Sequence, residues 1–305
     1  MNTLIVVTGP TGVGKTELCL SLAERYNVDI INADSRQIYA ELPIGTAAPT
    51  AEQQRRVRHH FVGTHHIGDY YSASMYEQDV LKLLATPPFQ HKNNIAAILT
   101  GGSMMYIDAV CNGIDDIPTV DQHTRNWMKQ RLEEEGLPAL LEELRRLDPE
   151  HWATVDHNNP RRVVHALEIC HISGKTYTSF RTGKKKPRPF KTIKIGLTRN
   201  REELYERINK RVLDMAEAGL IDEARTMMPH RKENALNTVG YKELFKHFDG
   251  DIPLQEALRQ IQSNTRQYAR KQLTWYKKDQ DITWFNPDDI EKIITYIDNK
   301  ISNNT

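Results

Sequence analysis

The segment from residue 9 to residue 16 constrains this chain more than any other, because it matches the phosphate-binding pattern G-x-x-x-x-G-K-[ST]. Its members are Gly9, Pro10, Thr11, Gly12, Val13, Gly14, Lys15 and Thr16. An apolar, β-branched run precedes it at residues 4–7, and a helical pattern follows at residues 17–26. This strand–loop–helix context favours a phosphate-binding loop over an ordinary Gly-rich turn.

Such a loop binds phosphate through its backbone and through two side chains. The glycines let successive N–H groups converge on phosphate oxygens, and the N-terminus of the following helix adds a partial positive charge. Lys15 supplies a full charge, and Thr16 supplies a hydroxyl ligand for Mg²⁺. The sequence therefore predicts a phosphorylated ligand with Mg²⁺ as cofactor.

Short apolar runs that alternate with helical patterns predict an α/β fold with a parallel sheet, similar to the core of P-loop NTPases. The expected strands are residues 4–7, 28–32, 95–99, 194–197 and 282–285. The expected helices are residues 17–26, 53–60, 74–85, 103–110, 201–218 and 253–275, followed by a C-terminal helix.

Residues 124–172 differ from the rest of the chain because they show helical patterning without a strand. We interpret this region as a mostly helical insertion at residues 116–191. The α/β core then comprises residues 1–115 and 192–305. A chain of 305 residues is long enough for two such units.

Composition excludes several classes of protein. With 39% apolar and 27% charged residues, the chain is globular rather than disordered. Cys19, Cys111 and Cys170 form no C-x-x-C pair, which argues against a zinc site or a disulfide framework. No leader precedes the first strand and no apolar run approaches ~18 residues, so we expect a cytoplasmic protein without a membrane span, and a monomer.

A carboxylate is predicted beside the phosphate loop. Residues 28–32 form an expected strand that ends just before Asp34, and ligands of parallel sheets bind beyond the carboxyl ends of the strands. The strand at residues 95–99 likewise runs into a tight turn before Ser103. The topology alone therefore brings Asp34 close to Lys15. The alternative is that Asp34 only caps a turn.

Charge is distributed unevenly along the chain. The net charge of +1 excludes a uniformly basic nucleic-acid binder but allows a local basic face. Residues 181–194 carry seven basic residues and no acidic residue, and they form either a solvated loop or a contact with RNA phosphates. The helix at 253–275 carries a basic stripe with no acid along it, for which we favour a phosphate or nucleic-acid role. The stripe consists of Arg259, Arg266, Arg270 and Lys277.

A phosphate loop, a nearby carboxylate and cationic surfaces suit two classes of reaction. One is phosphoryl transfer from ATP. The other is displacement at carbon with pyrophosphate as the leaving group. Composition and spacing do not choose between them.

The residue patterns of a series of motifs are more specific than composition and spacing. The series comprises residues 9–16, 34–39, 44–47, 101–106, 239–243 and 265–275. In this order the motifs resemble those of bacterial tRNA dimethylallyltransferases, and the resemblance runs from residue 3 to about residue 285.

The resemblance implies transfer of a dimethylallyl group from dimethylallyl diphosphate to N6 of adenosine 37 in tRNA. The phosphate loop and Mg²⁺ then hold the pyrophosphate, with Arg207 as a further cation. Asp34 becomes the general base for a poorly nucleophilic amine, and Ser103 contacts the adenosine. The target base has to leave its stack to reach such a site.

The resemblance also implies contacts with the tRNA anticodon stem-loop, largely through the helical insertion. The residues carried over are Asp34, Ser35, Arg36, Gln37, Ser103, Arg125, Arg161, Arg162, Val163, Val164, His165, Gly240, Tyr241, Lys242, Arg266 and Arg270. The sequence departs from the family pattern at Ser103, which replaces a usual Thr, and at Ala48, which replaces a usual Lys. Arg161 likewise replaces a Gln, and His165 replaces an Arg.

Three alternatives stay open on the sequence. A transferase that prenylates free AMP or ADP would not need the insertion or the basic segments. A nucleotide or small-molecule kinase would use Asp34 as a Mg²⁺-linked carboxylate and bind ATP in the loop. An RNA-binding module with a vestigial nucleotide site would have no need for the intact Lys15, Thr16 and Asp34.

Overall fold

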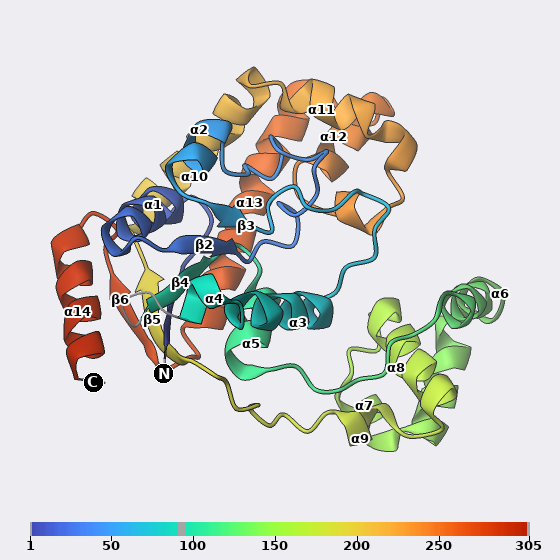
Figure 1. Cartoon of the computed structure of the whole chain (residues 1–305). Coiled ribbons are helices and arrows are strands. Elements are labelled where there is room, and N and C mark those ends of the chain that lie inside the picture. The colour runs from blue at the N-terminus through green and yellow to red at the C-terminus, as the bar shows by residue number, and fades with distance from the viewer. Residues whose placement is uncertain (1, 91–94, 304–305) are drawn as a thin grey trace. The chain divides into compact units, whose positions relative to one another are not determined.

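The computed structural model describes residues 2–90 and 95–303, and this part of the chain contains a six-stranded sheet (Figure 1). The strands are β1 (Thr3–Thr8), β2 (Asp29–Asn32), β3 (His59–His60), β4 (Ile95–Thr100), β5 (Lys191–Leu197) and β6 (Ile282–Phe285). They lie in the order β3-β2-β4-β1-β5-β6, and every neighbouring pair is parallel. The predicted α/β fold with a parallel sheet is confirmed.

Helices and loops connect the strands. The α-helices of the first half are α1 (Lys15–Tyr26), α2 (Ala51–Arg56), α3 (Ala73–Leu84), α4 (Pro87–Gln90), α5 (Met104–Asn112), α6 (Gln122–Leu147) and α7 (Pro149–Thr154). Those of the second half are α8 (Pro160–Ser173), α9 (Tyr177–Phe180), α10 (Arg201–Glu217), α11 (Leu220–Thr226), α12 (Tyr241–Phe248), α13 (Leu254–Tyr276) and α14 (Ile290–Ser302). Short 3₁₀ helices, η1 (Met228–His230) and η2 (Asn234–Leu236), precede α12.

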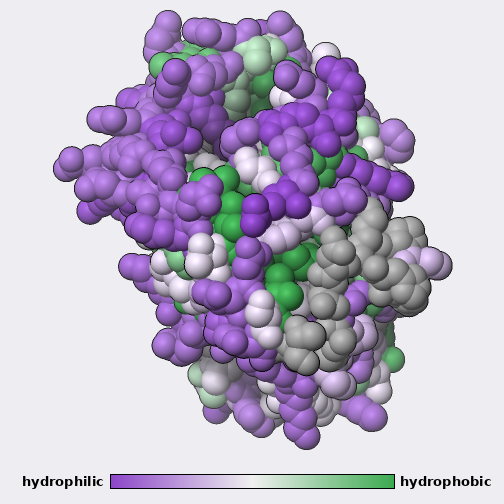
Figure 2. Space-filling view, turned by 60° about the vertical axis from the view of Figure 1, so that its left-hand side comes forward, coloured by the Kyte–Doolittle hydropathy of each residue, from purple (hydrophilic) through white to green (hydrophobic). Residues whose placement is uncertain are grey.

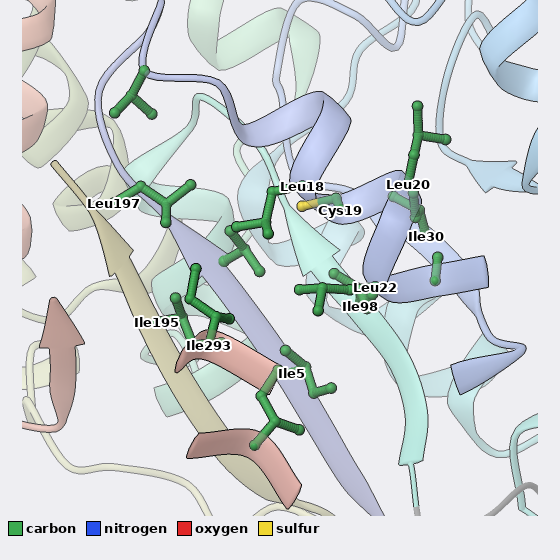
Figure 3. Packing of buried hydrophobic residues seen from close by; sticks show 14 of the residues in the cluster. Ile5, Leu18, Cys19, Leu20, Leu22, Ile30, Ile98, Ile195, Leu197 and Ile293 are labelled. Carbon is green, nitrogen blue, oxygen red and sulfur yellow. The ribbon is translucent and has the colours of Figure 1, made fainter. Parts of the chain in front are cut away.

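The sheet is buried on both faces, as its continuous apolar runs predict. Ile5 of β1 lies on the face covered by α1 and α14, where it joins Leu18 and Ile293 in one hydrophobic cluster (Figure 3). The next residue along the strand points the other way, so Leu4 packs on the opposite face with Tyr76 of α3. This packing holds β1, and the loop that follows it, rigidly in the middle of the sheet.

A third hydrophobic cluster joins the segment after β2 to the helices α10–α13. Ile38 and Leu42 of that segment pack with Leu220 of α11 and Tyr241 of α12, and all of these side chains are fully buried. The chain that leaves the carboxyl end of β2 is therefore held against helices that occur about two hundred residues later.

The chain divides into two compact units, one formed by residues 1–112 and 187–305 and the other by residues 113–186. The sequence-based division at 116 and 191 differs from this one by a few residues, because the segment that leads into β5 belongs to the first unit. In the second unit, helices α6–α9 surround a core that contains Leu140 and Leu167. Asp148 accepts hydrogen bonds from the His151 backbone and from the Thr178 backbone and hydroxyl, so one carboxylate joins the start of α7 to α9.

One local expectation was wrong. The polar run at residues 53–60 is helical only as far as Arg56, and His59 and His60 instead form β3. These residues pair with Ile30 and Ile31 of β2, and pairing at the sheet edge overrides the weak local pattern.

The visible surface is mostly hydrophilic. On the face in Figure 2, hydrophobic residues appear only in small separate patches. No helix in the described part of the chain combines the length and the apolar character that crossing a membrane requires.

Candidate functional site

The candidate site lies in the first unit, beyond the carboxyl ends of β1, β2 and β4. These strands are adjacent and parallel, so the loops that follow them meet at one edge of the sheet. A cavity of about 530 Å³ is lined there by Lys15, Asp34, Gly102 and Arg207, among others. The topology thus brings the phosphate loop and the predicted carboxylate together, as the sequence analysis expected.

A second cavity, of about 860 Å³, adjoins the first. Both cavities share a set of wall residues, namely Thr11, Asp34, Thr46, Ala47, Arg211 and Tyr268. Asp34 and Arg211 therefore stand at the boundary between one cavity at the phosphate loop and another that opens toward α12. A site with this plan can hold two ligands on opposite sides of one carboxylate.

The phosphate loop has the strand–loop–helix form that the motif requires. Gly14 has a left-handed backbone with φ of 110° at the start of α1, a conformation that favours glycine. The Lys15 ammonium donates to the carbonyl oxygens of Gly9 and Pro10, at 2.9 Å each. The Thr16 hydroxyl is exposed and has no hydrogen-bond partner among the described residues. It is therefore free to bind a ligand.

Two arginines from the second half of the chain also bind the loop. Arg207 of α10 donates through Nε to the Gly12 carbonyl oxygen at 2.9 Å. Arg199, which precedes α10, donates to the Val13 carbonyl oxygen at 2.9 Å and pairs with Asp288. The charge of Arg199 is balanced by Asp288 and Glu203, whereas Arg207 adds its charge to that of Lys15 at the loop, which favours an anionic ligand.

The electrostatics at Lys15 reflect this crowding of cations. Burial, followed by the neighbouring Arg211 guanidinium, lowers the pKa of Lys15 to about 8, against weaker opposing effects of Cys19 and Asp34. Burial also lowers the pKa of Arg211. In the part of the chain that the structure describes, the Arg211 guanidinium has no hydrogen-bond partner. An anion bound between these cations would relieve their repulsion.

Asp34 uses its two carboxylate oxygens differently. Oδ1 accepts hydrogen bonds from the backbone N–H groups of Arg36 at 2.9 Å and Gln37 at 3.3 Å. The turn-capping alternative is therefore also correct, because Asp34 does cap its own turn. Oδ2 faces Gly102, where a Cβ atom would lie only 2.4 Å away, and accepts no hydrogen bond from the described residues. One oxygen is thus fixed, and the other is available to a ligand.

Ser103 stands slightly apart from the cavities. Its backbone N–H donates to the Ala33 carbonyl oxygen at 3.0 Å, which ties the loop after β4 to the end of β2. Its hydroxyl accepts from the Tyr106 backbone at 3.3 Å and so caps α5. The neighbouring Gly102, rather than Ser103, lines the cavity beside Asp34.

The loop at residues 44–47 forms a wall of both cavities. The Gln37 amide donates to the carbonyl oxygens of Thr46 and Ala47, so this amide N–H₂ is committed to the loop. Ala47 has a left-handed backbone with φ of 49°, which is uncommon for a residue with a Cβ atom. The Glu223 carboxylate accepts hydrogen bonds from the backbone N–H groups of residues 44 and 45 and from the Tyr241 hydroxyl. These bonds attach the loop to α11 and α12.

The other predicted RNA contacts of this unit fall in different places. Ser35, Arg36, Gly240 and Lys242 line the second cavity. Tyr241 is fully buried in the hydrophobic cluster after β2, so its side chain is a core residue and not an RNA contact.

The basic stripe on α13 does not act as one surface. Arg259 is paired with Glu256 of the same helix at 2.7 Å. The expectation that no acid lies along the stripe is therefore wrong. Arg266 donates to the Asn209 side chain, whereas Arg270 lines a separate shallow groove. Lys277 lies just past the end of the helix.

The basic segment 181–194 also divides. Arg188 forms a buried ion pair with Glu77, and the buried Lys194 pairs with the partly exposed Asp279 at 2.6 Å. These two cations stabilise the first unit and are not available to RNA. The prediction that the whole segment contacts RNA phosphates is therefore wrong. Exposed cations such as Lys184 and Lys185 belong to the second unit.

The second unit carries the remaining predicted RNA contacts. Arg161 and Arg162 are exposed on the first turn of α8, and His165 is half-buried beside Glu168. The half-buried Arg125 donates to the Val120 carbonyl oxygen, and Val164 is partly exposed. Their neighbour Val163 is fully buried in the core of this unit, so its side chain cannot touch RNA.

Sequence reasoning missed several residues of the site. The sequence shows Arg211 one helical turn after Arg207 and so on the same face, but only Arg207 was given a role. Gln272 and Tyr268 of α13 line the cavity although no spacing in the sequence relates them to the phosphate loop.

Comparison with known proteins gives concordant results. The family model described as IPP transferase matches residues 37–279. A protein named tRNA dimethylallyltransferase 1 from Bacteroides thetaiotaomicron is 58% identical over 297 residues, which cover 97% of this chain and 96% of the relative. One of the same name from Phocaeicola vulgatus is 60% identical over 296 residues, covering 97% and 98%. The crystal structure of a full-length tRNA isopentenylpyrophosphate transferase from Bacillus halodurans is similar with a TM-score of 0.71 and 32% identity, covering 99% of this chain and 98% of that one.

Proposed function

The chain belongs to the IPP transferase family of enzymes and prenylates tRNA, and we propose that it transfers a dimethylallyl group from dimethylallyl diphosphate to N6 of adenosine 37, with release of pyrophosphate. The observation that carries the finer proposal is the position of Asp34 on the wall between two adjoining cavities. In this proposal the diphosphate occupies the cavity at the phosphate loop. The adenine enters through the cavity beside α12.

The leaving group is stabilised by cations at the phosphate loop. Lys15, Arg207 and Arg211 line the first cavity, and each can neutralise charge that develops as the carbon–oxygen bond to pyrophosphate breaks. The two latter arginines lie one turn apart on α10 and therefore present a double cation from one rigid element. This preorganisation lowers the barrier because the cations need not move during the reaction.

Mg²⁺ fits this site as an ion bound mainly by the diphosphate rather than by a full set of protein ligands. The described residues contain no group of three or more acidic, His or Cys side chains that could hold a metal, but they offer the exposed Thr16 hydroxyl. Mg²⁺ commonly takes one or two protein ligands together with substrate phosphate oxygens and water. When bound, it would supply further positive charge to the leaving group.

Asp34 is the proposed general base. The exocyclic amine of adenine is a weak nucleophile and has to lose a proton as it attacks carbon. Oδ2 of Asp34 accepts no hydrogen bond from the described residues, while Oδ1 is held by the turn, so the carboxylate is both oriented and available. The adenine proton passes to Oδ2 as the new carbon–nitrogen bond forms.

The tRNA is recognised around the extruded base. Arg36 and Lys242 line the second cavity and can contact phosphates that flank the flipped nucleotide. The exposed Arg161 and Arg162 of the second unit offer further phosphate contacts with the anticodon stem-loop. In this proposal a single chain carries out the reaction as a monomer, since Lys15, Asp34 and Arg207 all line one cavity within it.

The proposal is tested by pyrophosphate release with matched RNA acceptors. The protein, Mg²⁺ and dimethylallyl diphosphate are incubated with an anticodon stem-loop that carries adenosine or inosine at the acceptor position. Inosine lacks the amine but keeps the shape of the purine. Pyrophosphate release with adenosine and none with inosine is expected. Equal release with free AMP would support a nucleotide prenyltransferase, and turnover of ATP with a small acceptor would support a kinase.

A further inference from the structure

Gln272 of α13 connects the two halves of the site. Its side chain is fully buried, and both ends of its amide are used. Oε1 accepts a hydrogen bond from the Thr11 backbone N–H at 2.8 Å, and Nε2 donates to the Gly102 carbonyl oxygen at 2.8 Å. One amide thus joins the phosphate loop to the loop after β4.

The second of these bonds fixes Gly102, which contacts the proposed base Asp34. Gly102 packs directly against Oδ2 of Asp34, where a Cβ atom at residue 102 would approach to 2.4 Å. Tyr268, one turn earlier on α13, also donates its hydroxyl to the Gly102 carbonyl oxygen at 2.8 Å. The position of Gly102 is therefore fixed from α13, and the space open to the Asp34 carboxylate depends on it.

A buried amide whose oxygen and nitrogen are both hydrogen-bonded makes such a connection specific. An apolar side chain of the same length would leave the Thr11 N–H without a partner in the interior, which is unfavourable. Only a group with one acceptor and one donor, spaced as in an amide, satisfies both loops at once.

We infer that Gln272 is a positioning residue for prenyl transfer, and that it sets the distance between the bound diphosphate and the Asp34 carboxylate. The inference rests on the proposed function, because it assigns the diphosphate to the phosphate loop and the base to Asp34. Gln272 lines the first cavity, but both its amide oxygen and its amide nitrogen are bound to protein atoms rather than turned to a ligand. It acts through Thr11 on one side and through Gly102 on the other.

The test separates the chemical step from binding. In Gln272→Met, the single-turnover rate of transfer to the stem-loop should fall about 10- to 100-fold, because small misplacements of reacting groups have effects of this size. The dissociation constants for pyrophosphate and for the stem-loop should stay within about 3-fold of the wild type. Gln262→Met is the matched control: Gln262 lies on the same helix and donates to the Asn209 backbone, away from both loops. It should keep the wild-type rate.

A double-mutant cycle distinguishes positioning of the base from a general structural role. If Gln272 acts through Asp34, Gln272→Met should slow the residual reaction of Asp34→Ala by less than about 3-fold. A full, multiplicative loss in that background would overturn the inference, as would a wild-type rate in Gln272→Met alone. Absence of transfer by the wild type would instead sink the proposed function, so the two failures are distinguishable.

Gln272→Glu provides an independent readout should the Met variant fold poorly. Ionised, the new carboxylate keeps the bond from Thr11 but faces the Gly102 carbonyl oxygen without a proton to donate. Protonated, it restores both bonds. The rate of Gln272→Glu relative to the wild type should therefore rise as the pH falls from about 8 to about 6, since burial raises the pKa of a carboxyl group. A ratio that does not change with pH would contradict the inference.

Discussion

Asp34 and Gly102 are in such close contact that residue 102 cannot carry a side chain without displacing the carboxylate. A Cβ atom there would lie 2.4 Å from Oδ2 of Asp34, well inside van der Waals contact. The two residues follow β2 and β4, which are neighbours in the sheet, so the contact is a direct consequence of strand order. The glycine is needed for room rather than for a special backbone conformation.

Gly102→Ala should therefore impair chemistry more than binding. The methyl group would push the Asp34 carboxylate away from its orientation, and a single-turnover rate about 10- to 100-fold below wild type is expected. Stem-loop affinity, measured by fluorescence anisotropy, should change little. Gly68→Ala is a control on open surface, where an added Cβ meets no atom within 4 Å. An unchanged transfer rate in Gly102→Ala would show that the carboxylate orientation is unimportant.

Asp34→Ala should slow transfer by about 100- to 10,000-fold, the range over which general bases contribute. Its affinity for the stem-loop should stay close to wild type, because the carboxylate is not a contact with RNA phosphates. The comparison needs single-turnover kinetics and a binding titration on the same preparation. A large loss of RNA affinity with little change in rate would assign Asp34 to binding instead.

Diphosphate binding should weaken as the pH rises through about 8. The pKa of Lys15 is lowered to about 8 by burial and by Arg211, so Lys15 is charged below that pH and neutral above it. An anionic ligand prefers the charged form, so the dissociation constant should rise by up to about tenfold per pH unit above the pKa. Calorimetry with pyrophosphate from about pH 7 to about pH 9.5 measures this dependence.

Lys15→Gln is the control for that titration. It keeps the ionisation of the ligand and removes that of the lysine, so the difference between the two pH profiles isolates Lys15. Parallel profiles in the two proteins would mean that Lys15 does not titrate in this range.

Neighbouring residues of α8 should have opposite roles. Val163→Ala removes a fully buried side chain from the core of the second unit and should cost about 2 kcal/mol of unfolding free energy. Arg162→Ala changes an exposed position and should alter stability by no more than about 0.5 kcal/mol. It should instead weaken stem-loop binding and reduce the slope of log affinity against log salt by about 1.

Thermal unfolding and salt-dependent binding titrations of both variants check this contrast. If Val163→Ala lowered RNA affinity without loss of stability, its assignment to the core would be contradicted.

The sequence predicted those residues of the site that belong to local motifs. Lys15, Thr16 and Asp34 could be placed because a strand–loop–helix pattern fixes the first two, and the end of the next strand fixes the third. The parallel sheet then brings them together for any sequence with this order of elements. Fold class followed from the same alternation of strands and helices.

Other residues could not be placed because their positions depend on packing between distant segments. The hydrogen bond from Thr11 to Gln272 spans 261 residues, and no local period encodes it. Val163 and Tyr241 were assigned to RNA from motif position, whereas hydrophobic packing places both in cores. The cations Arg188 and Lys194 belong to a basic run that suggests RNA contacts, but both are buried and paired, Arg188 with the buried Glu77 and Lys194 with the partly exposed Asp279. Charge in a sequence does not reveal which acid will neutralise it.

The most direct test of the central claim is the intact mass of an unmodified anticodon stem-loop after incubation with the protein, Mg²⁺ and dimethylallyl diphosphate, with and without ATP. The account predicts a mass gain equal to one five-carbon prenyl group, dependent on the diphosphate and independent of ATP, and absent when inosine replaces the acceptor adenosine. An RNA of unchanged mass, together with consumption of ATP, would contradict it.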